Sequence, residues 1–333
     1  MKTIEEKIFF KRKYLTNTKK FKKRKRIKSK PPKKAFKYKF KFIIYILIFI
    51  LLLFFISKKI YEKLYAYPQD DLTLVSAYYK ISKSKHSSKD YLKWIANFAK
   101  LNKSMVYFTN KEFMPIFKEM RPKNLHHKTV FIELEFEEFF AYKNLYNQFK
   151  ETYKIDPERR IHSVRLYIIW AEKCTFLKKA IKQNYFNSKC FYWVDSGYFR
   201  ESENGMEKYI NNWPSTKKCF EDDRVIIGQI RGYNALEQKK IVNFDKYTHR
   251  LLRKSSNVAG GFFGGQIKNS LKFVDLYYNS IRLFNENNIF IGKDQNIFTY
   301  MAFAHPEIIK LIKLRSFMEF KNILFSLNNL IEL

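Results

Sequence analysis

The sequence predicts an α/β fold, a single domain with a mostly parallel, mixed sheet flanked by helices and preceded by one transmembrane helix. From residue 72 onward, apolar runs typical of buried strands alternate with segments of helical period. An unbroken apolar run, Phe42–Ile56, comes before them. The buried strand Phe191–Val194 ends directly in Asp195. In open α/β sheets, ligands bind at the edge where such strands end.

The first 41 residues form a basic, low-complexity tail. They contain 19 Lys or Arg against Glu5 and Glu6, a net +17 out of +34 for the whole chain. Such a segment buries too little apolar surface to fold alone. We expect a cytosolic tail that touches anionic lipid. Nucleic-acid binding is the alternative, but it calls for groove-reading or aromatic partners in a folded module, so no nucleic acid is expected.

The run Phe42–Ile56 predicts a membrane anchor. As a helix it spans about 22 Å, against about 27 Å for the hydrocarbon core of the endoplasmic reticulum. Lys41 and Lys58 can snorkel at its ends. A signal peptide is the alternative, but no small-x-small cleavage site follows. We therefore predict an uncleaved signal anchor.

The steep charge asymmetry across this run predicts a single-pass type II membrane protein with a cytosolic amino terminus. The rest of the chain would face the lumen of the Golgi or endoplasmic reticulum, or the cell surface. The predicted organisation is a tail at 1–41, the anchor at 42–57, a stem at 58–71 and a folded domain at 72–333.

The chain has three cysteines, Cys174, Cys190 and Cys219, and none forms a CxxC pair. The absence of a CxxC pair makes a zinc site unexpected. A lumenal domain could hold one disulfide and one free thiol, and the sequence leaves the pairing open.

The first half of the domain alternates strands and helices. Asp90 suits the start of a helix as cap or first-turn acid, and the acidic start at Glu137 favours another helix dipole. A loop, Lys80–Lys89, carries Lys85 and His86. Strands are predicted at Leu72–Tyr79, Met105–Thr109 and Thr129–Leu134, and helices at Asp90–Leu101, Lys111–Met120 and Glu137–Phe149.

The second half begins with the longest helical pattern, Ser163–Tyr185. Lys173 lies at the edge of its apolar stripe. It is either a snorkelling lysine or a contact to phosphate or sugar. Further strands are predicted at Phe191–Val194 and Arg224–Ile230, and helices at Lys268–Asn287 and Asn296–Ala304.

Asp195 follows its strand at once and precedes Ser196 and Gly197. One interpretation is a β-turn in which Asp195 accepts turn N–H groups. The other is a carboxylate that faces a ligand at the sheet edge.

Four of the nine glycines lie in the nine residues Asn257–Gly265. Paired glycines allow a close backbone approach or a positive φ. The flanked Phe262-Phe263 can form a short strand or an aromatic wall, and a tight hairpin is the structural alternative. The pattern is neither GxGxxG nor a Walker motif, so it does not support a nicotinamide or P-loop nucleotide site.

Asp294 opens the helix that continues through Gln295. It is either the N-cap of that helix or a carboxylate that faces the ligand cleft. The sequence shows no Ser/His/Asp triad, HExxH or CxxC constellation, and its six histidines are scattered.

Several segments together resemble the HtrL/YibB-type family, which is grouped with GT-A-like glycosyltransferases. The resemblance covers roughly residues 72–312. The matching segments are Leu74–Tyr79 with Ser84-Lys85-His86, Tyr91–Trp94 leading to Met105–Phe108, Trp170–Lys173, Trp193–Gly197, Gly260–Gly265 and Asp294-Gln295.

The resemblance implies a GT-A-like domain that moves a sugar from a nucleotide-sugar donor to a glycan, glycolipid or protein acceptor. In such folds an Asp-x-Asp usually coordinates a divalent metal that bridges the donor diphosphate. Carboxylate oxygens suit Mn²⁺ or Mg²⁺. Here Gly197 stands where the second Asp would be, so Asp195 alone is the expected metal or ribose ligand.

The mechanistic hypothesis places the donor diphosphate near Asp195, with a glycine loop, Gly260–Gly265, shaping the sugar or acceptor pocket. Asp294 would act as general base if the enzyme inverts, and Lys85 or Lys173 would offset phosphate charge. The expected catalytic residues are Asp195 and Asp294, and the expected donor-binding residues are Lys85, Lys173, Asp195, Gly197, Gly260, Gly261, Gly264, Gly265 and Gln295.

A second function class remains open. The missing second carboxylate at Gly197 also fits a non-catalytic carbohydrate-binding or scaffold protein built on a degenerate glycosyltransferase fold.

Overall fold

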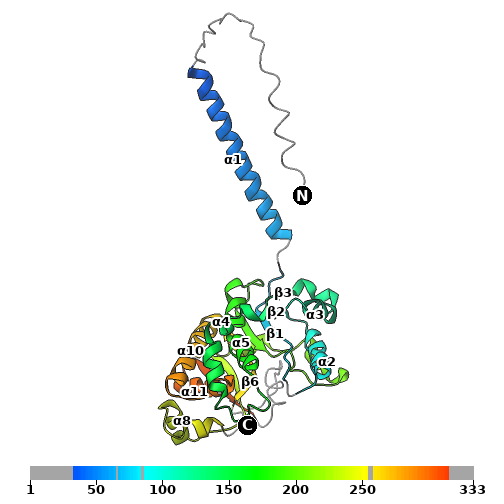
Figure 1. Ribbon diagram of the computed structural model, residues 1–333. Helices are drawn as coiled ribbons and strands as arrows, with labels where there is room; N and C mark the ends of the chain where they lie inside the picture. Colours follow the sequence, from blue (N-terminus) through cyan, green and yellow to red (C-terminus); the bar gives the residue numbers. More distant parts are fainter. Residues whose placement is uncertain (1–32, 65–66, 84–85, 254–257, 315–333) are drawn as a thin grey trace, which may run out of the picture. The chain divides into compact units, whose positions relative to one another are not determined.

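The computed structural model describes residues 33–64, 67–83, 86–253 and 258–314 (Figure 1). The chain forms two compact units, Met1–Ala66 and Tyr67–Leu333. Helix α1 (Lys33–Leu64) belongs to the first unit, and the second unit holds the α/β domain.

The predicted apolar run Phe42–Ile56 lies within α1, and its side chains are exposed. The helix continues to Leu64, into the predicted stem. Within the described residues, no helix combines the length and the apolar character needed to cross a membrane. The type II topology and the localisation stay predictions.

The second unit is built on one mixed sheet of seven strands in the order β3-β2-β1-β4-β6-β5-β7. All neighbouring strands pair in parallel except β6, which is antiparallel to both β4 and β5. The strands are β1 (Leu72–Tyr78), β2 (Ser104–Thr109), β3 (Thr129–Glu133), β4 (Cys190–Val194), β5 (Val225–Gln229), β6 (Val258–Gln266) and β7 (Ile309–Lys313).

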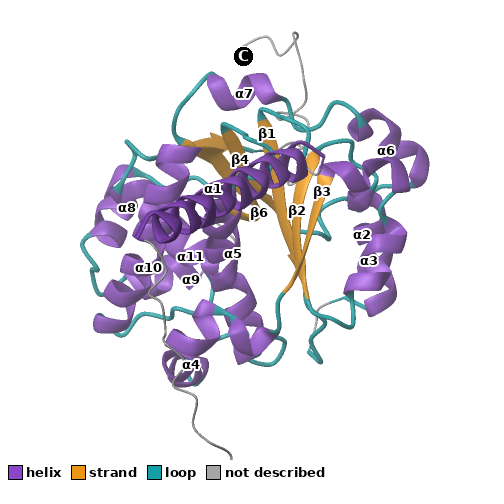
Figure 2. Ribbon diagram, turned by 90° about the horizontal axis from the view of Figure 1, so that it is seen from above, coloured by secondary structure: helices purple, strands orange, loops and turns teal. Residues whose placement is uncertain are grey.

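Helices cover both faces of this sheet (Figure 2). One face is covered by α2, α3 and α6, and the other by α4, α5, α8, α9, α10 and α11. The helices of the domain are α2 (Ser88–Ala99), α3 (Met114–Met120), α4 (Phe140–Tyr153), α5 (Val164–Gln183), α6 (Glu203–Ile210), α7 (Thr216–Phe220), α8 (Ala235–Val242), α9 (Thr248–Arg253), α10 (Ile267–Glu286) and α11 (Asp294–Ala304).

Successive side chains of a strand point to opposite sides of the sheet. Because helices cover both sides, the central strands are buried on both faces. Leu74 and Tyr192 belong to the core under α2, while Val75 and Trp193 belong to the core under α5. This explains why β1 and β4 are continuous apolar runs rather than alternating ones. The predicted α/β class with a mostly parallel sheet is confirmed.

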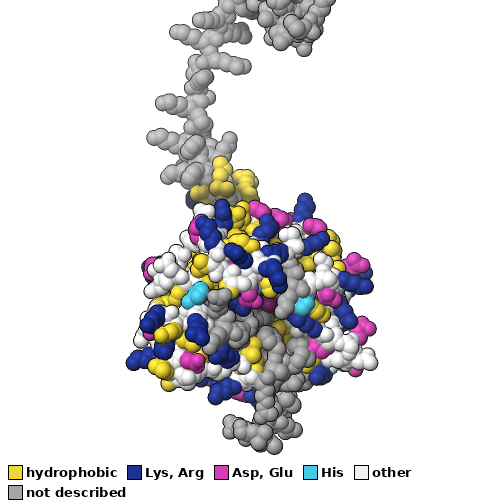
Figure 3. Space-filling model, turned by 60° about the horizontal axis from the view of Figure 1, so that its bottom comes forward, with side chains coloured by type: hydrophobic (Ala, Val, Ile, Leu, Met, Phe, Trp, Pro, Cys, Tyr) yellow, Lys and Arg dark blue, Asp and Glu magenta, His cyan; other side chains and the backbone are white. Residues whose placement is uncertain are grey.

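Charged side chains are interspersed on the face shown in Figure 3, where dark blue Lys and Arg lie among magenta Asp and Glu. Surface pairs include Lys100 with Glu203 at 2.7 Å and Lys178 with Asp275 at 2.6 Å. Such exposed pairs contribute little to stability.

The glycine-rich segment contains the short strand that was expected at Phe262-Phe263, but the strand is longer. The segment is neither a hairpin nor a loop but the nine-residue strand β6, between β4 and β5. Gly264 has φ +149°, and a Cβ there would lie 2.1 Å from the carbonyl oxygen of Phe191. Only glycine lets the reversed strand approach β4 so closely.

The structure pairs Cys190 with Cys219, which joins the start of β4 to α7. Cys174 is buried and free. Of the disulfide pairings that the sequence left open, the structure contains Cys190–Cys219.

Glu172 fixes α4 against α5. Its buried carboxylate accepts the backbone N–H groups of Phe140 at 3.1 Å and Ala141 at 2.8 Å, at the start of α4. These groups have no partner within their own helix. Burial raises the pKa of Glu172 to about 7, although both hydrogen bonds and the charges of Lys179 and Lys143 oppose the shift.

We predict that Glu172→Gln stabilises the fold more at high pH than at low pH. Because the pKa of Glu172 is raised in the folded state, the wild type loses stability as pH rises from about 4.5 to about 7, and the amide variant does not. In urea unfolding, the stability of the variant relative to wild type should increase by up to about 3 kcal/mol between pH 4.5 and pH 8.

The matched control is Glu207→Gln on the exposed side of α6. Its stability relative to wild type should change much less over the same pH range. A Glu172→Gln difference that is independent of pH would contradict the assignment.

Candidate functional site

The candidate site lies where the strand order reverses. The strand β1 pairs in parallel with β2 on one side and with β4 on the other. Connections that diverge from two neighbouring parallel strands leave a crevice at their carboxyl ends, and ligands of open α/β sheets bind there. Asp195 directly follows β4 and therefore lies at this crevice.

A cavity of about 130 Å³ opens at this position. It is formed by the end of β1, the segment leading into α2, one face of α5 and the end of β4. The lining residues are Ala77, Tyr78, Tyr79, Ile81, His86, Ser88, Tyr91, Leu166, Ile169, Trp170, Lys173, Trp193, Asp195 and Ser196.

Asp195 presents a half-exposed carboxylate to this cavity, with 39% of its side chain accessible. Trp193 Nε1 donates a 2.7 Å hydrogen bond to Asp195 Oδ1. The backbone N–H of Asp195 donates to the carbonyl of Gly261 at 2.8 Å, and its carbonyl accepts from Tyr198 N at 2.9 Å. Asp195 thus begins a turn through its backbone carbonyl while its carboxylate faces the cavity, and its role toward a ligand stays a prediction.

Lys173 lies beneath Asp195, and its side chain is only 5% exposed. Its Nζ is 3.0 Å from Asp195 Oδ1, 3.1 Å from Asp294 Oδ2 and 3.1 Å from the carbonyl oxygen of Gly260. Burial by itself would lower the pKa of Lys173, but the charges of the two carboxylates outweigh burial and raise it. The snorkelling alternative is wrong, because the ammonium points into the protein.

Asp294 is the first residue of α11, and its side chain is 4% exposed. The N-cap is Lys293, so Asp294 is not the cap. Its Oδ1 accepts the backbone N–H of Gln295 at 2.8 Å. Burial raises the pKa of Asp294, while the ammonium of Lys173 opposes that shift. Asp294 does not line the cavity.

The glycines of β6 divide into two pairs. A Cβ on Gly260 would lie 3.1 Å from Asp294 Oδ2, and one on Gly261 would lie 3.4 Å from Asp195 Oδ2. Gly264 and Gly265 instead face the backbones of β4 and β5. The structure therefore brings the first pair to the site, and it places the second pair within the sheet.

The other predicted donor-binding residues are placed as follows. Gly197 lies against the ring of Tyr91, since a Cβ there would be 3.3 Å away. Gln295 donates from its side chain to the carbonyl of Val258 and so ties α11 to β6. Lys85 lies outside the described residues.

Three aromatic residues of the cavity lie in the segments that match the family but were not predicted as site residues. Trp193 precedes Asp195 by two positions, and this spacing puts two residues of an extended chain on the same side. Trp170 precedes Lys173 by three positions on α5, which puts both on one helix face. Tyr91, near the start of α2, completes the set. The spacings of Trp193 to Asp195 and of Trp170 to Lys173 were therefore the sequence signal that could have placed these tryptophans at the site.

The residues at Asp195 do not fit a divalent metal. Both carboxylate oxygens face N–H donors, with Trp193 Nε1 and Lys173 Nζ at Oδ1 and Lys173 Nζ 3.2 Å from Oδ2. Mn²⁺ and Mg²⁺ take several oxygen ligands, and the ammonium repels a second cation at the same carboxylate. In the described ranges, no group of three or more His, Cys, Asp or Glu side chains could hold a metal ion.

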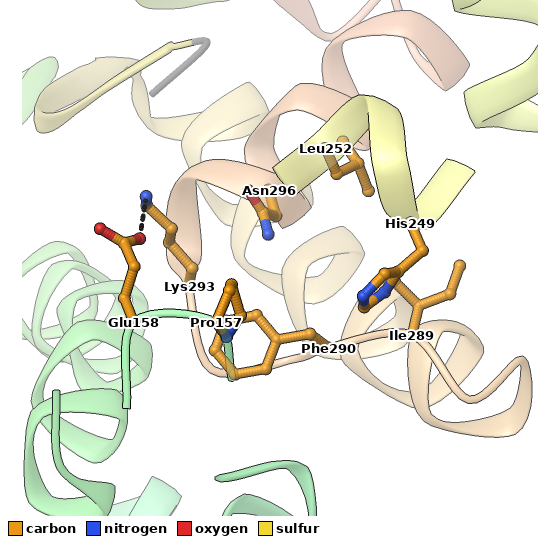
Figure 4. A pocket seen from close by; sticks show the side chains of 8 residues that line it. All are labelled: Pro157, Glu158, His249, Leu252, Ile289, Phe290, Lys293 and Asn296. Carbon is orange, nitrogen blue, oxygen red and sulfur yellow. Dashed lines mark hydrogen bonds and ion pairs between the residues drawn. The ribbon is translucent and has the colours of Figure 1, made fainter. Parts of the chain in front are cut away.

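A second, much smaller cavity of about 20 Å³ lies beside the start of α11 (Figure 4). Lys293 and Glu158 form an ion pair of 3.0 Å at its edge. His249 and Asn296 supply further polar groups to its lining. Its volume suits about one water molecule, so it is not a substrate site.

The fold and the site define an α/β protein with a cavity at the switch point of its sheet. A family model described as "Bacterial protein of unknown function (HtrL_YibB)" matches residues 70–325, and the chain belongs to this family. The family resemblance expected from the sequence is thereby confirmed.

One solved structure is similar over 74% of this chain and 75% of its own. It is the core-mannan synthase A of Aspergillus fumigatus in its Mn/GDP form, at 13% identity and a TM-score of 0.43. No curated protein matches the sequence significantly.

We predict that Gly260→Ala destabilises the protein by about 1–3 kcal/mol in chemical unfolding. The added methyl would lie 3.1 Å from Asp294 Oδ2 and would push this carboxylate away from Lys173. Gly232→Ala is the matched control, since its Cβ meets nothing within 4 Å. Equal stabilities of the two variants would show that the packing of β6 against Asp294 does not matter.

Proposed function

We propose that this protein is a GT-A-like glycosyltransferase that moves a sugar from a nucleotide-sugar donor to a glycan, glycolipid or protein acceptor. The observation that carries the proposal is Asp195, a half-exposed carboxylate at the end of β4 that lines a cavity at the switch point of the sheet. The resemblance to the GT-A-like group through the matched family motifs supports it.

The cavity has the chemistry that a nucleotide sugar needs. Tyr91 and Trp170 offer aromatic faces, and stacking of a base on such a face contributes about 1–3 kcal/mol. A carboxylate such as Asp195 accepts hydrogen bonds from ribose or sugar hydroxyls. Trp193 and Lys173 hold this carboxylate in place, so little ordering is required when the donor binds.

Lys173, in the lining of the cavity, and the buried Asp294 act as positioning residues for Asp195. Lys173 Nζ donates hydrogen bonds to Asp195 and to the Gly260 carbonyl and forms an ion pair with Asp294, so its positive charge is already matched within the protein. The general-base role of Asp294 stays a prediction, and its burial favours the positioning role. The donor-binding roles of the other predicted residues also stay predictions.

A non-catalytic carbohydrate-binding or scaffold role is the second candidate. The observation that favours it is that Gly197 replaces the second carboxylate, while Asp294, the other carboxylate near Asp195, is buried and ion-paired. The two candidates differ in whether a nucleoside diphosphate is released from a donor.

We predict that Asp195→Asn lowers release of nucleoside diphosphate from the active nucleotide sugar by about 10²-fold. The assay screens a panel of nucleotide sugars with wild-type protein and then compares the variants on the best donor. The amide keeps the volume of the side chain but removes the charge that faces the cavity and Lys173.

Asp275→Asn is the control, because this carboxylate is an exposed partner of Lys178 on the surface. It should retain wild-type activity. Full activity in folded Asp195→Asn protein would contradict the assignment. Sugar binding without donor turnover in the wild type would favour the non-catalytic role.

Localisation is a separate proposal. We propose that α1 tethers the protein to a membrane and that the domain faces an oxidising compartment, either the lumen of the Golgi or endoplasmic reticulum or the cell surface. The consecutive exposed apolar side chains Phe42–Ile56 support the tether, because water disfavours such a surface. The Cys190–Cys219 disulfide supports the oxidising compartment.

We predict that the protein stays in the membrane pellet after an alkaline carbonate wash and that the double variant Ile48→Arg, Leu52→Arg does not. Each Arg near the middle of the run disfavours insertion by about 2.5–3.5 kcal/mol. Leu236→Arg, at an exposed position of α8, is the control and should remain in the pellet. Wild-type protein in the supernatant would contradict the tether.

A further inference from the structure

Oxygen atoms from three separate parts of the fold surround Lys173 Nζ. They are the two carboxylate oxygens of Asp195 at 3.0 and 3.2 Å, Asp294 Oδ2 at 3.1 Å and the Gly260 carbonyl oxygen at 3.1 Å. Two carboxylates and a backbone carbonyl are the ligand types that a hard divalent cation selects. In this protein an ammonium group occupies the centre of that oxygen set.

We infer that Lys173 serves as a covalently attached cation in the place of a divalent metal, and that this site binds its ligand without one. That the ligand is a nucleotide rests on the proposed function. That Lys173 takes the place of a metal ion rests only on the oxygen atoms around its ammonium.

The contacts of the ammonium support the inference. Lys173 donates hydrogen bonds to Asp195 Oδ2 and to the Gly260 carbonyl, and it forms ion pairs with both carboxylates. The ammonium therefore already balances the charge of the oxygen set. A metal ion could enter only by displacing the ammonium from its three partners.

Burial makes that displacement unfavourable. The side chains of Lys173 and Asp294 are 5% and 4% exposed, and removing one member of a buried ion pair leaves an uncompensated charge. The lysine is also fixed by α5, which packs along β1 and β4. The positive charge is thus a permanent part of the site rather than an exchangeable one.

The test uses the full-length protein stripped with EDTA, with MnCl₂ alone as the probe. Lys173→Met removes the ammonium from an otherwise intact oxygen set. We expect this variant to melt at a lower temperature than wild type and to recover about 3 °C or more in 1 mM MnCl₂. Wild-type protein should shift by less than about 1 °C under the same conditions.

Lys178→Met is the matched control, since it removes a lysine of the same helix that pairs with Asp275 on the surface. It should not respond to MnCl₂. If Lys173→Met does not fold, calorimetric titration of wild-type protein with MnCl₂ tests whether the site binds a metal ion. No saturable binding up to millimolar MnCl₂ supports the inference, and saturable binding overturns it.

A second arm titrates UDP and GDP into wild-type protein with EDTA or with MnCl₂, in 0.3 M NaCl to screen the basic tail. Equal affinity in EDTA and MnCl₂ supports both the inference and the proposed function. Binding that requires MnCl₂ overturns the inference and leaves the function standing. If neither nucleotide binds, the proposed function loses its support, while the titration with MnCl₂ alone still decides the inference.

Discussion

The ion pairs of Lys173 are the interaction on which the candidate site depends. One buried ammonium joins α5, the end of β4, strand β6 and the start of α11. Neither Asp294 nor Lys173 could remain buried and charged without the other. The same contacts fix the one carboxylate of the cluster that is half-exposed, Asp195, so the buried network sets the geometry of the accessible group.

The reversed strand β6 makes this arrangement sterically feasible. Its first two glycines leave room for Asp294 and Asp195, and Gly264 lets its backbone pass β4 at close range. A side chain at Gly260 would occupy the space that the buried carboxylate now fills. The glycine-rich sequence is therefore a packing requirement of this site.

Much of the fold could be predicted from the sequence, because its central strands and long helices have strong apolar patterns. The run Phe191–Val194 and the period of Ser163–Tyr185 correspond closely to β4 and α5. The direction of β6 could not be predicted, since a run of glycines and two phenylalanines carries no periodic signal. The helices α6 to α9 are only five to eight residues long, too short for a clear period.

The residue types in the sequence indicated which residues belong to the site, but they did not indicate which of these residues contact one another. Asp195, Lys173 and Asp294 were each singled out, yet each had an ordinary structural alternative. Only tertiary structure brings the last two together, because they lie on α5 and α11, far apart in the chain. Trp193 was overlooked as a partner because its ring belongs to the core while its Nε1 reaches Asp195.

The most direct test of the central claim is a crystal structure of the protein with a bound nucleoside diphosphate. The account predicts that the nucleotide occupies the cavity between Tyr91 and Trp170, within hydrogen-bond reach of Asp195, with Lys173 still paired to both carboxylates. A nucleotide bound elsewhere, or an ammonium withdrawn from Asp195, would contradict it.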